Sequence, residues 1–401
     1  MAPNIEDIEE EQRQFSNVIS TFHNYERYSL SANNRRRKDI YTLPRRDQEL
    51  LDGLGYKQKL DAVDKAILVN AEFLAQIVED TDLFQGDDQG EEQIQIPPHH
   101  DTHSTNQDRS HSYSHDLKHG SHGKGNIQKK YKPTDFDFDK LRSTLKQFVR
   151  DWSSEGKIER DSCYEPLKEA LVAHYAHVPP EERHQLRVLV PGAGLGRLAF
   201  DVAKLGFSCQ GNEFSHYMLL SSFFVLNKTT EIKKHTIYPY VHSFSNAPNQ
   251  QSILQAISIP DVLPSDLPEG SNFSLVAGDF EEIYGTESDP QEPQHGKWDA
   301  ILTCFFIDTA KNIVNYLRII HQILALGGIW INLGPLLWHW ENNNTNDPSI
   351  ELDMQELKTL MTKMGFEISN ERAIDTTYTN NAQSMLGYVY KASMWTATKK
   401  S

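Results

Sequence analysis

Cysteine, long apolar runs and positive charge are all scarce in this 401-residue sequence. The three cysteines, Cys163, Cys209 and Cys304, are far apart and form no CxxC pair, which argues against a disulfide framework or a thiolate zinc site. The longest apolar runs, 218–226 and 300–307, are far shorter than the roughly 18 residues that suggest a membrane span. The acidic N-terminus, MAPNIEDIEEEQ, does not look like a secretory signal. We therefore expect a soluble, intracellular protein in a reducing compartment, without a membrane partner.

Acidic residues outnumber basic ones, with 56 Asp and Glu against 40 Lys and Arg, for a formal net charge of −16. Because phosphate binding needs clustered cations, this balance argues against a nucleic-acid-binding protein. The run RRRK at 35–38 is a candidate nuclear-import signal, although such runs are common on solvated loops. We expect a cytoplasmic protein and leave nuclear import open.

The sequence divides into three regions. The first is an N-terminal helical region, 1–84, and the second is an insert, 85–130. Apolar residues recur at helical spacing in 11–30 and 60–78, which predicts amphipathic helices that brace the domain further on. The insert is rich in His, Asp, Ser and Gly and has almost no large apolar side chains, so we expect it to be disordered. Seven of the 17 histidines lie there, but their irregular spacing favours a flexible insert over a metal site. We expect no bound metal.

The third region, 131–401, begins with apolar residues at helical spacing in 136–152, where Gln147 and Arg150 share a face. From about residue 185, strand-like runs alternate with helical stretches: RVLVPG, FSCQGNE, FSLVAGD, WDAILTCFFID and GGIWINLG. This alternation predicts an α/β domain with a mostly parallel sheet and helices on both faces. Two later runs, GFEISNERAI and MLGYVYKASMWTA, are candidates for an antiparallel edge.

The strongest local signal is the glycine-rich turn in VLVPGAGLGR, which follows the first strand of this region. Glycines let backbone amides come close to a ligand at the start of the next helix. A dinucleotide fingerprint starting at Gly192 would need its third glycine where Arg197 stands. The turn instead reads GxGxG, through Gly192, Gly194 and Gly196. Taken alone, it would also fit a plain strand-to-helix connection.

Acidic residues end the next two strands. Glu213 follows the second strand, where a carboxylate can accept hydrogen bonds from both hydroxyls of a ribose. Asp279 ends the third strand, and with Phe280 it would supply an acceptor and an aromatic wall for an adenine. Each acid alone would more often be solvated, but in order with the glycine turn they indicate a nucleoside pocket. The combination resembles the Rossmann-like class I S-adenosylmethionine (SAM) methyltransferase fold, with a mostly parallel seven-stranded sheet and, here, an N-terminal helical extension.

Longer motifs make the resemblance more specific. In sequence order, TLKQFVRDWS, PGAGLGRLAF, QGNEFS, GDFEEIY, TCFFIDTA and GGIWINLGPLLWHWEN resemble the carnosine N-methyltransferase family, from about Phe136 to the C-terminus. Members of that family transfer a methyl group from SAM to the ring nitrogen of carnosine nearest the side-chain stem, giving anserine. The resemblance implies a small-molecule substrate and a homodimer built with the N-terminal helices.

The resemblance also places the family's site residues on this chain. With Gly194 of the glycine turn, the implied SAM contacts are Gln147, Arg150, Gly192, Glu213, Asp279, Phe280 and Cys304. Arg150 would pair with the methionyl carboxylate. The implied dipeptide contacts are Asp308, His339, Tyr378 and Tyr390, with Asp308 and His339 as the catalytic pair and Tyr388 as an alternative to Tyr390. Without the resemblance, His339 would fit a histidine packed between Trp338 and Trp340, and Cys304 a small buried apolar residue.

The expected chemistry fits these residue types. A sulfonium methyl group is already activated, so catalysis consists chiefly of holding the nucleophile in line. An imidazole with an unperturbed pKa of about 6.5 is mostly neutral at pH 7 and needs no strong base. Asp308 could accept the N–H of the far ring nitrogen and stabilise the cation that forms, while His339 could orient the ring or help remove the proton afterwards. We expect the acceptor to be carnosine or a related histidine dipeptide. Two alternatives stay open: methylation of another peptide or a protein histidine, and a non-catalytic module that retains SAM.

Overall fold

The computed structural model describes residues 5–79, 131–285 and 294–400. The insert predicted at 85–130, with its histidines, lies outside the described residues. Among the described helices, none combines the length and the apolar character needed to cross a membrane.

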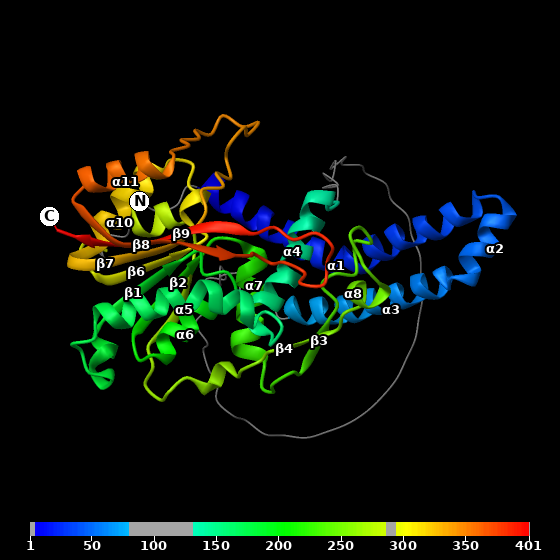
Figure 1. Cartoon of the computed structure of the whole chain (residues 1–401), viewed down its shortest axis with the longest axis horizontal. Coiled ribbons are helices and arrows are strands. Elements are labelled where there is room, and N and C mark those ends of the chain that lie inside the picture. Colours follow the sequence, from blue (N-terminus) through cyan, green and yellow to red (C-terminus); the bar gives the residue numbers. More distant parts are fainter. Residues whose placement is uncertain (1–4, 80–130, 286–293, 401) are drawn as a thin grey trace, which may run out of the picture. The chain divides into compact units, whose positions relative to one another are not determined.

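A seven-stranded sheet in the order β5-β2-β1-β6-β7-β9-β8 forms the centre of the domain (Figure 1). Its strands are β1 (Arg187–Pro191), β2 (Ser208–Glu213), β5 (Phe273–Ala277), β6 (Trp298–Cys304), β7 (Leu324–Gly334), β8 (Phe366–Thr376) and β9 (Tyr390–Lys399). The first five pair in parallel, and β9 pairs antiparallel with both β7 and β8. The structure thus confirms the predicted mostly parallel sheet and its antiparallel edge. A small antiparallel pair, β3 (His235–Ile237) and β4 (Ile257–Ile259), was not predicted.

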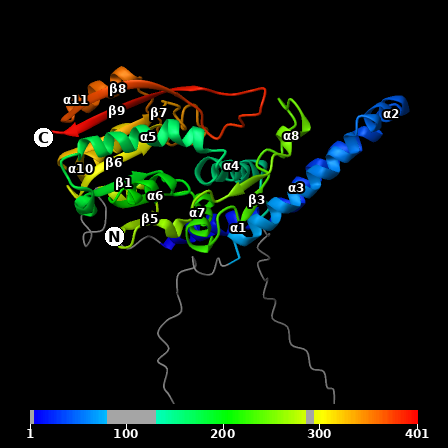
Figure 2. The ribbon, with the colours of Figure 1, turned by 60° about the horizontal axis from the view of Figure 1, so that its bottom comes forward.

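Alternating residues of the strands supply two separate hydrophobic clusters. Val188 and Val190 of β1 pack in the cluster that includes α5, whereas Leu189 between them packs in the cluster that includes α10. Both faces of the central strands are therefore buried, which explains why these strands read as continuous apolar runs in the sequence. The helices of the α/β part are α5 (Lys157–His174), α6 (Arg197–Lys204), α7 (His216–Lys228), α8 (Gln250–Ile253), α9 (Phe280–Tyr284), α10 (Ile313–Ile323) and α11 (Met354–Lys363) (Figure 2).

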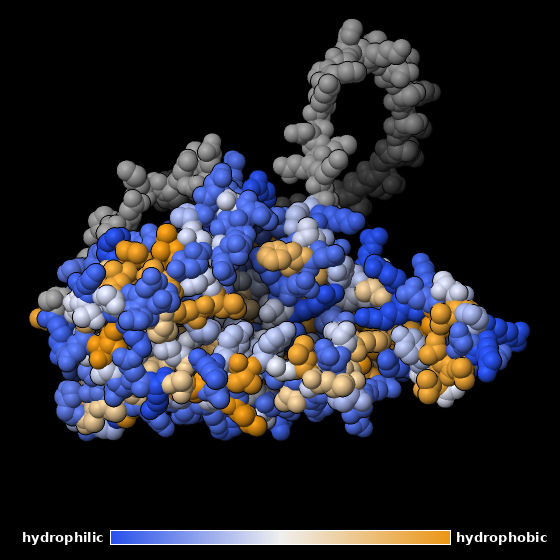
Figure 3. Space-filling model, turned by 45° about the horizontal axis from the view of Figure 1, so that its top comes forward, coloured by the Kyte–Doolittle hydropathy of each residue, from blue (hydrophilic) through white to orange (hydrophobic). Residues whose placement is uncertain are grey.

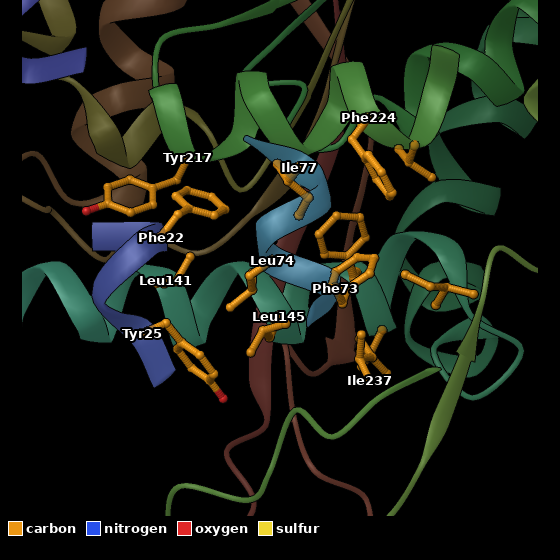
Figure 4. Packing of buried hydrophobic residues seen from close by; sticks show 14 of the residues in the cluster. Phe22, Tyr25, Phe73, Leu74, Ile77, Leu141, Leu145, Tyr217, Phe224 and Ile237 are labelled. Carbon is orange, nitrogen blue, oxygen red and sulfur yellow. The ribbon is translucent and has the colours of Figure 1, made fainter. Parts of the chain in front are cut away.

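The N-terminal helices are α1 (Ile5–Tyr41), α2 (Arg45–Gly53) and α3 (Tyr56–Ile77), and α4 (Asp135–Trp152) follows the segment that is not described. Side chains of α1, α3, α4 and α7 share one hydrophobic cluster (Figure 4). In it, the rings of Phe22 and Tyr217 stack with centroids 5.9 Å apart, and Phe73 meets Phe148 edge-on. The N-terminal helices therefore brace α4 and α7, as their apolar pattern predicts.

The basic run at 35–38 lies within α1 and not on a loop as we considered. Arg37 from this run is held by Asp61 and Asp64 of α3, at 2.7 Å and 2.6 Å. The apolar pattern ended the predicted helix at residue 30, but Arg and Lys are good helix formers and extend it to Tyr41.

Candidate active site

The glycine turn lies between β1 and α6, and its glycines adopt backbone angles that other residues avoid. Gly192, Gly194 and Gly196 have φ values of +65°, +56° and +80°. A Cβ atom on Gly192 would lie 2.6 Å from Cδ2 of Phe306, a buried ring. Glycine is therefore required at 192 both for its backbone conformation and for the close approach of Phe306.

The Gly192→Ala variant is expected to lose about 2–4 kcal/mol of unfolding free energy, from left-handed strain plus the clash with Phe306. Gly270→Ala is the matched control, because Gly270 has φ +80° and nothing within 4 Å of its added Cβ. The control should lose only about 1–2 kcal/mol. Urea unfolding measures both values, and equal losses would contradict the claim that Phe306 closes on the turn.

Glu213, at the end of β2, binds main-chain amides with both carboxylate oxygens. Oε2 accepts from the Gly194 amide at 2.8 Å, and Oε1 accepts from the amides of Phe214 and Ser215 at 2.9 Å and 2.8 Å. Burial raises the pKa of Glu213, and the three amide hydrogen bonds oppose that rise. The carboxylate thus fixes the glycine turn, and it retains acceptor capacity on Oε2, which accepts a single hydrogen bond from the residues that the structure describes.

Asp279 and Phe280, after β5, have local structural contacts. Oδ1 of Asp279 caps α9 by accepting from the amides of Glu281 and Glu282. The Phe280 ring is only 3% exposed, and its centroid lies 5.3 Å from that of Phe306. Its ring therefore packs in the core of the described structure and is not an open surface.

Arg150, near the end of α4, is buried among several polar groups. Its Nη1 donates to the Tyr164 hydroxyl at 2.6 Å and lies 3.5 Å from Oδ1 of Asp151. Its Nε lies 3.2 Å from Oε1 of Glu159, without the alignment of a hydrogen bond. In the described part of the chain, Nη2 meets only the sulfur of Cys304, at 3.8 Å. This weak contact leaves Nη2 as the donor best placed to bind an anionic group.

Gln147, one turn before Arg150, borders the glycine turn. A Cβ on Gly194 would lie 3.4 Å from Gln147 Nε2 and 3.7 Å from Oδ2 of Asp151. Gln147 also donates to Asp151 at 3.2 Å. The structure therefore brings the end of α4 directly against the glycine turn.

Two buried arginines hold the end of α4 in this position. Arg160 donates to the carbonyls of Arg150 and Ser153 at 2.8 Å and 2.7 Å, and Arg197 donates to the carbonyl of Asp151 at 2.8 Å. Both arginines also pair with Asp261. Because the last carbonyls of a helix have no partner within the helix, these contacts stabilise its end. Arg197, which replaces the third glycine of a dinucleotide fingerprint, is thus part of the site's framework.

Asp308 connects two loops that follow β6 and β7. Its Oδ2 accepts from the Leu337 amide at 2.9 Å, and its carbonyl accepts from the His339 amide at 3.0 Å. Asp308 is 2% exposed, and burial raises the pKa of its carboxyl group. The His339 side chain is exposed and not packed as a core residue. The structure thus brings together the two residues predicted as the catalytic pair.

Aromatic residues from the loop that follows β6 and from the C-terminal part of the chain meet beside Cys304. The Phe305 ring lies 4.9 Å from that of Tyr378 and 5.5 Å from that of Tyr390, between centroids. Phe305 has φ +54°, an uncommon value for a residue other than glycine. Tyr388, by contrast, is 70% exposed. Sequence analysis missed Phe305, because nothing in TCFFIDTA marks which phenylalanine turns back at the strand end.

Two other hollows of the surface lie away from this arrangement. One, of about 780 Å³, is lined by residues of α11 and β8 such as Lys358 and Glu367, and the other, of about 210 Å³, includes Arg187 and Trp298 at the opposite ends of the strands. Neither contains a residue predicted for the site. We prefer the carboxyl ends of β1, β2, β5 and β6, because ligands of open α/β sheets bind there.

Known proteins resemble most of this chain in sequence. Residues 127–401 match the family model described as carnosine N-methyltransferase. A mouse carnosine N-methyltransferase is 41% identical over 97% of this chain and 86% of its own length, and one from Schizosaccharomyces pombe is 45% identical over 64% of this chain and 69% of its own length. A solved SAM-dependent methyltransferase from Methanosarcina mazei is far more distant, at 11% identity and a TM-score of 0.36 over 56% of this chain and 96% of that one.

The family match and the chain's own sheet order together assign its class. The match covers more than half of the chain, including α4, the glycine turn and the loops of Asp308 and His339. The sheet, with its last strand inserted antiparallel between β7 and β8, is that of the class I methyltransferases. With the family match, SAM is the cofactor. The chain is therefore a SAM-dependent methyltransferase that belongs to the carnosine N-methyltransferase family.

Proposed function

We propose that this chain methylates the imidazole ring nitrogen of carnosine nearest the side-chain stem, producing anserine and S-adenosylhomocysteine. The observation that supports this most directly is the buried carboxylate of Asp308, which lies just after β6 and is bonded to the loop of His339. An imidazole has two ring nitrogens, and its tautomer decides which of them carries the lone pair that attacks the methyl group. A fixed carboxylate at this position can hold one tautomer by accepting a hydrogen bond from the other nitrogen.

The residues present fit SAM. Nη2 of Arg150, which has a weak contact with the Cys304 sulfur, suits a methionyl carboxylate. The glycine turn allows close approach of a ligand, and the remaining acceptor capacity of Glu213 suits a ribose hydroxyl. Asp279 and the main chain of Phe280 would border the adenine, while Gln147, Gly192, Gly194 and Cys304 would line the methionyl side. SAM supplies a sulfonium methyl group, which needs no further activation.

Asp308 selects the nucleophile. Its carboxylate accepts the N–H of the far ring nitrogen, so the near nitrogen keeps its lone pair for the methyl group. The negative charge also stabilises the imidazolium cation that the transfer produces, an effect that is strong because Asp308 is buried. His339, exposed beside this carboxylate, orients the ring. The pair therefore supplies tautomer control and charge stabilisation without a strong base.

Tyr390 and Tyr388 provide a matched pair for testing the dipeptide contacts. Tyr390 packs against Phe305, whereas Tyr388 is mostly exposed, so we assign the substrate contact to Tyr390. Tyr390→Phe should raise the KM for carnosine about threefold to tenfold through the loss of one hydrogen bond. Tyr388→Phe should leave KM unchanged. Steady-state kinetics at saturating SAM would refute the assignment if the two effects were reversed.

A homodimer formed through the N-terminal helices is part of the proposal. Apolar side chains are exposed at and beside α2, with Leu50 63% and Leu54 81% exposed, and Figure 3 shows hydrophobic side chains at that end of the helices. A second copy of the chain would cover such residues. The cytoplasmic or nuclear location of the protein stays a prediction from the sequence.

The decisive assay is incubation of the protein with methyl-labelled SAM and a panel of carnosine, homocarnosine, free histidine and cell protein. Mass spectrometry then locates the label. We expect it on the near ring nitrogen of carnosine. Label on a protein histidine would support a protein methyltransferase instead, and SAM binding without turnover on any acceptor would support a non-catalytic module.

A further inference from the structure

Glu159, in the first turn of α5, lies between the cofactor side and the substrate side of the proposed site. Its side chain is 11% exposed and lies 3.2 Å from Nε of Arg150, the residue assigned to the methionyl carboxylate. No motif of the sequence marks this residue, since it is one of several acids on α5 and its partners are far along the chain.

The other contacts of Glu159 hold the segment 377–380. Oε2 accepts from the Thr377 hydroxyl at 2.6 Å and from the Asn380 amide at 3.2 Å, and Oε1 accepts from the Thr379 amide at 2.7 Å. Thr379 has φ +50°, a strained value for a β-branched residue. A conformation of this kind persists only when its surroundings hold it, and the Glu159 carboxylate supplies three of the hydrogen bonds that do so.

Tyr378 lies in the middle of this segment, and its side chain contacts Arg150. Its ring faces the Arg150 guanidinium at 4.8 Å from Cζ to the ring centroid, and it also packs against Phe305. Arg150 thus contacts both Glu159 and Tyr378, and Glu159 holds the residues on either side of Tyr378. A change in the position of Glu159 would change the position of Tyr378 relative to the guanidinium.

We propose that Glu159 is a positioning residue, which fixes the segment 377–380 on Arg150 and so places the Tyr378 side chain for the dipeptide. This rests on the proposed function for the identity of the dipeptide. In this arrangement the position of Tyr378, on the substrate side, depends on Arg150, on the cofactor side. The guanidinium that binds the methionyl carboxylate also contacts Glu159 and Tyr378.

Loss of the Glu159 charge should affect the two ligands differently. Glu159→Gln removes an acceptor from the segment 377–380, but it also removes a carboxylate that competes with the methionyl carboxylate for Arg150. Binding of the cofactor should therefore stay within about threefold of wild type, whereas the KM for carnosine should rise on the order of tenfold, the cost of one hydrogen bond to a charged acceptor. A merely structural role would weaken both ligands together.

The test compares Glu159→Gln with Glu169→Gln, an exposed residue of the same helix. Calorimetry with S-adenosylhomocysteine gives cofactor affinity, kinetics give the KM for carnosine, and hydrogen exchange follows the amides of Thr379 and Asn380. We expect a higher KM, faster exchange of both amides and near-normal cofactor affinity in Glu159→Gln alone, with Glu159→Asp restoring slow exchange in part.

Hydrogen exchange separates this inference from the proposed function. If wild-type protein does not methylate carnosine, the proposed function fails, but exchange and cofactor affinity still report on Glu159. Unchanged exchange at Thr379 and Asn380, or equal loss of affinity for both ligands, would overturn the positioning role.

Discussion

The Asp308→Asn variant is expected to bind SAM normally and to lose methyl transfer by on the order of 100-fold or more in kcat. An asparagine carries no charge to stabilise the imidazolium product. Its single amide oxygen also has to serve both the Leu337 amide, which now bonds to Oδ2, and the ring N–H. Calorimetry with S-adenosylhomocysteine and a turnover assay with carnosine measure the two effects.

Asp39→Asn is the matched control, because Asp39 is exposed on α1, far along the chain from the site. It should keep wild-type turnover. Activity of Asp308→Asn within about threefold of wild type would remove Asp308 from the mechanism, since a lost general acid–base or charge contribution is larger than that.

The stability of Asp308→Asn provides a second check, through the pKa of the carboxyl group. Burial raises this pKa, so the folded protein binds the proton more tightly than the unfolded chain does. The resulting stabilisation of the folded state is fully present below the pKa of the carboxyl group in the unfolded chain, about 3.9. It is lost as the pH rises through the pKa of the same group in the folded protein. The ionised carboxylate therefore costs stability at neutral pH, and Asp308→Asn should have a Tm at pH 7.5 that is not lower than wild type. A clear fall in Tm would mean that Asp308 serves chiefly to hold the fold.

The Arg150→Lys variant is expected to weaken SAM binding on the order of 100-fold, through loss of directed hydrogen bonds of the guanidinium. Lysine keeps the positive charge beside Asp151 and Glu159, so their buried carboxylates retain a partner. A compact ammonium group cannot reach Tyr164, Glu159 and a ligand carboxylate at once. Alanine is unsuitable for this test, because removing one partner of a buried ion pair costs about 3–5 kcal/mol of stability.

Arg142→Lys, on the same helix, is the control for this prediction. Arg142 pairs with Asp139 one turn earlier and contacts none of the proposed site residues that are described. Calorimetry should show wild-type affinity for S-adenosylhomocysteine in Arg142→Lys and the large loss in Arg150→Lys alone. Equal affinities in the two variants would contradict the assignment of the methionyl carboxylate to Arg150.

Patterns along the chain were sufficient to predict the sheet and the residues at its strand ends. The apolar runs of β1 and β6 have the length of buried strands, and a turn, a carboxylate or a loop that directly follows a strand must lie at its carboxyl end. Glu213, Asp279 and Asp308 were placed in this way. The ligand roles of Arg150 and of the tyrosines near the C-terminus came instead from resemblance to a family, because Arg150 meets Cys304 and Tyr378 from more than 100 residues away.

Other features depend on tertiary contacts that no local pattern reveals. Phe280 follows an acid at a strand end, and only the packing of Phe306 against it shows that its ring is buried. Phe305 and Phe306 are neighbours in sequence, yet one faces the tyrosines and the other the core. Glu159 resembles any exposed helical acid until the segment 377–380 is seen to bind it.

The most direct test of the central claim is a crystal structure of the protein with S-adenosylhomocysteine and carnosine. We predict the homocysteine carboxylate on Arg150, the ribose at Glu213, and the imidazole with its far nitrogen on Asp308 and its near nitrogen facing the sulfur. Density for either ligand in the hollow between α11 and β8, or an imidazole that does not touch Asp308, would contradict this account.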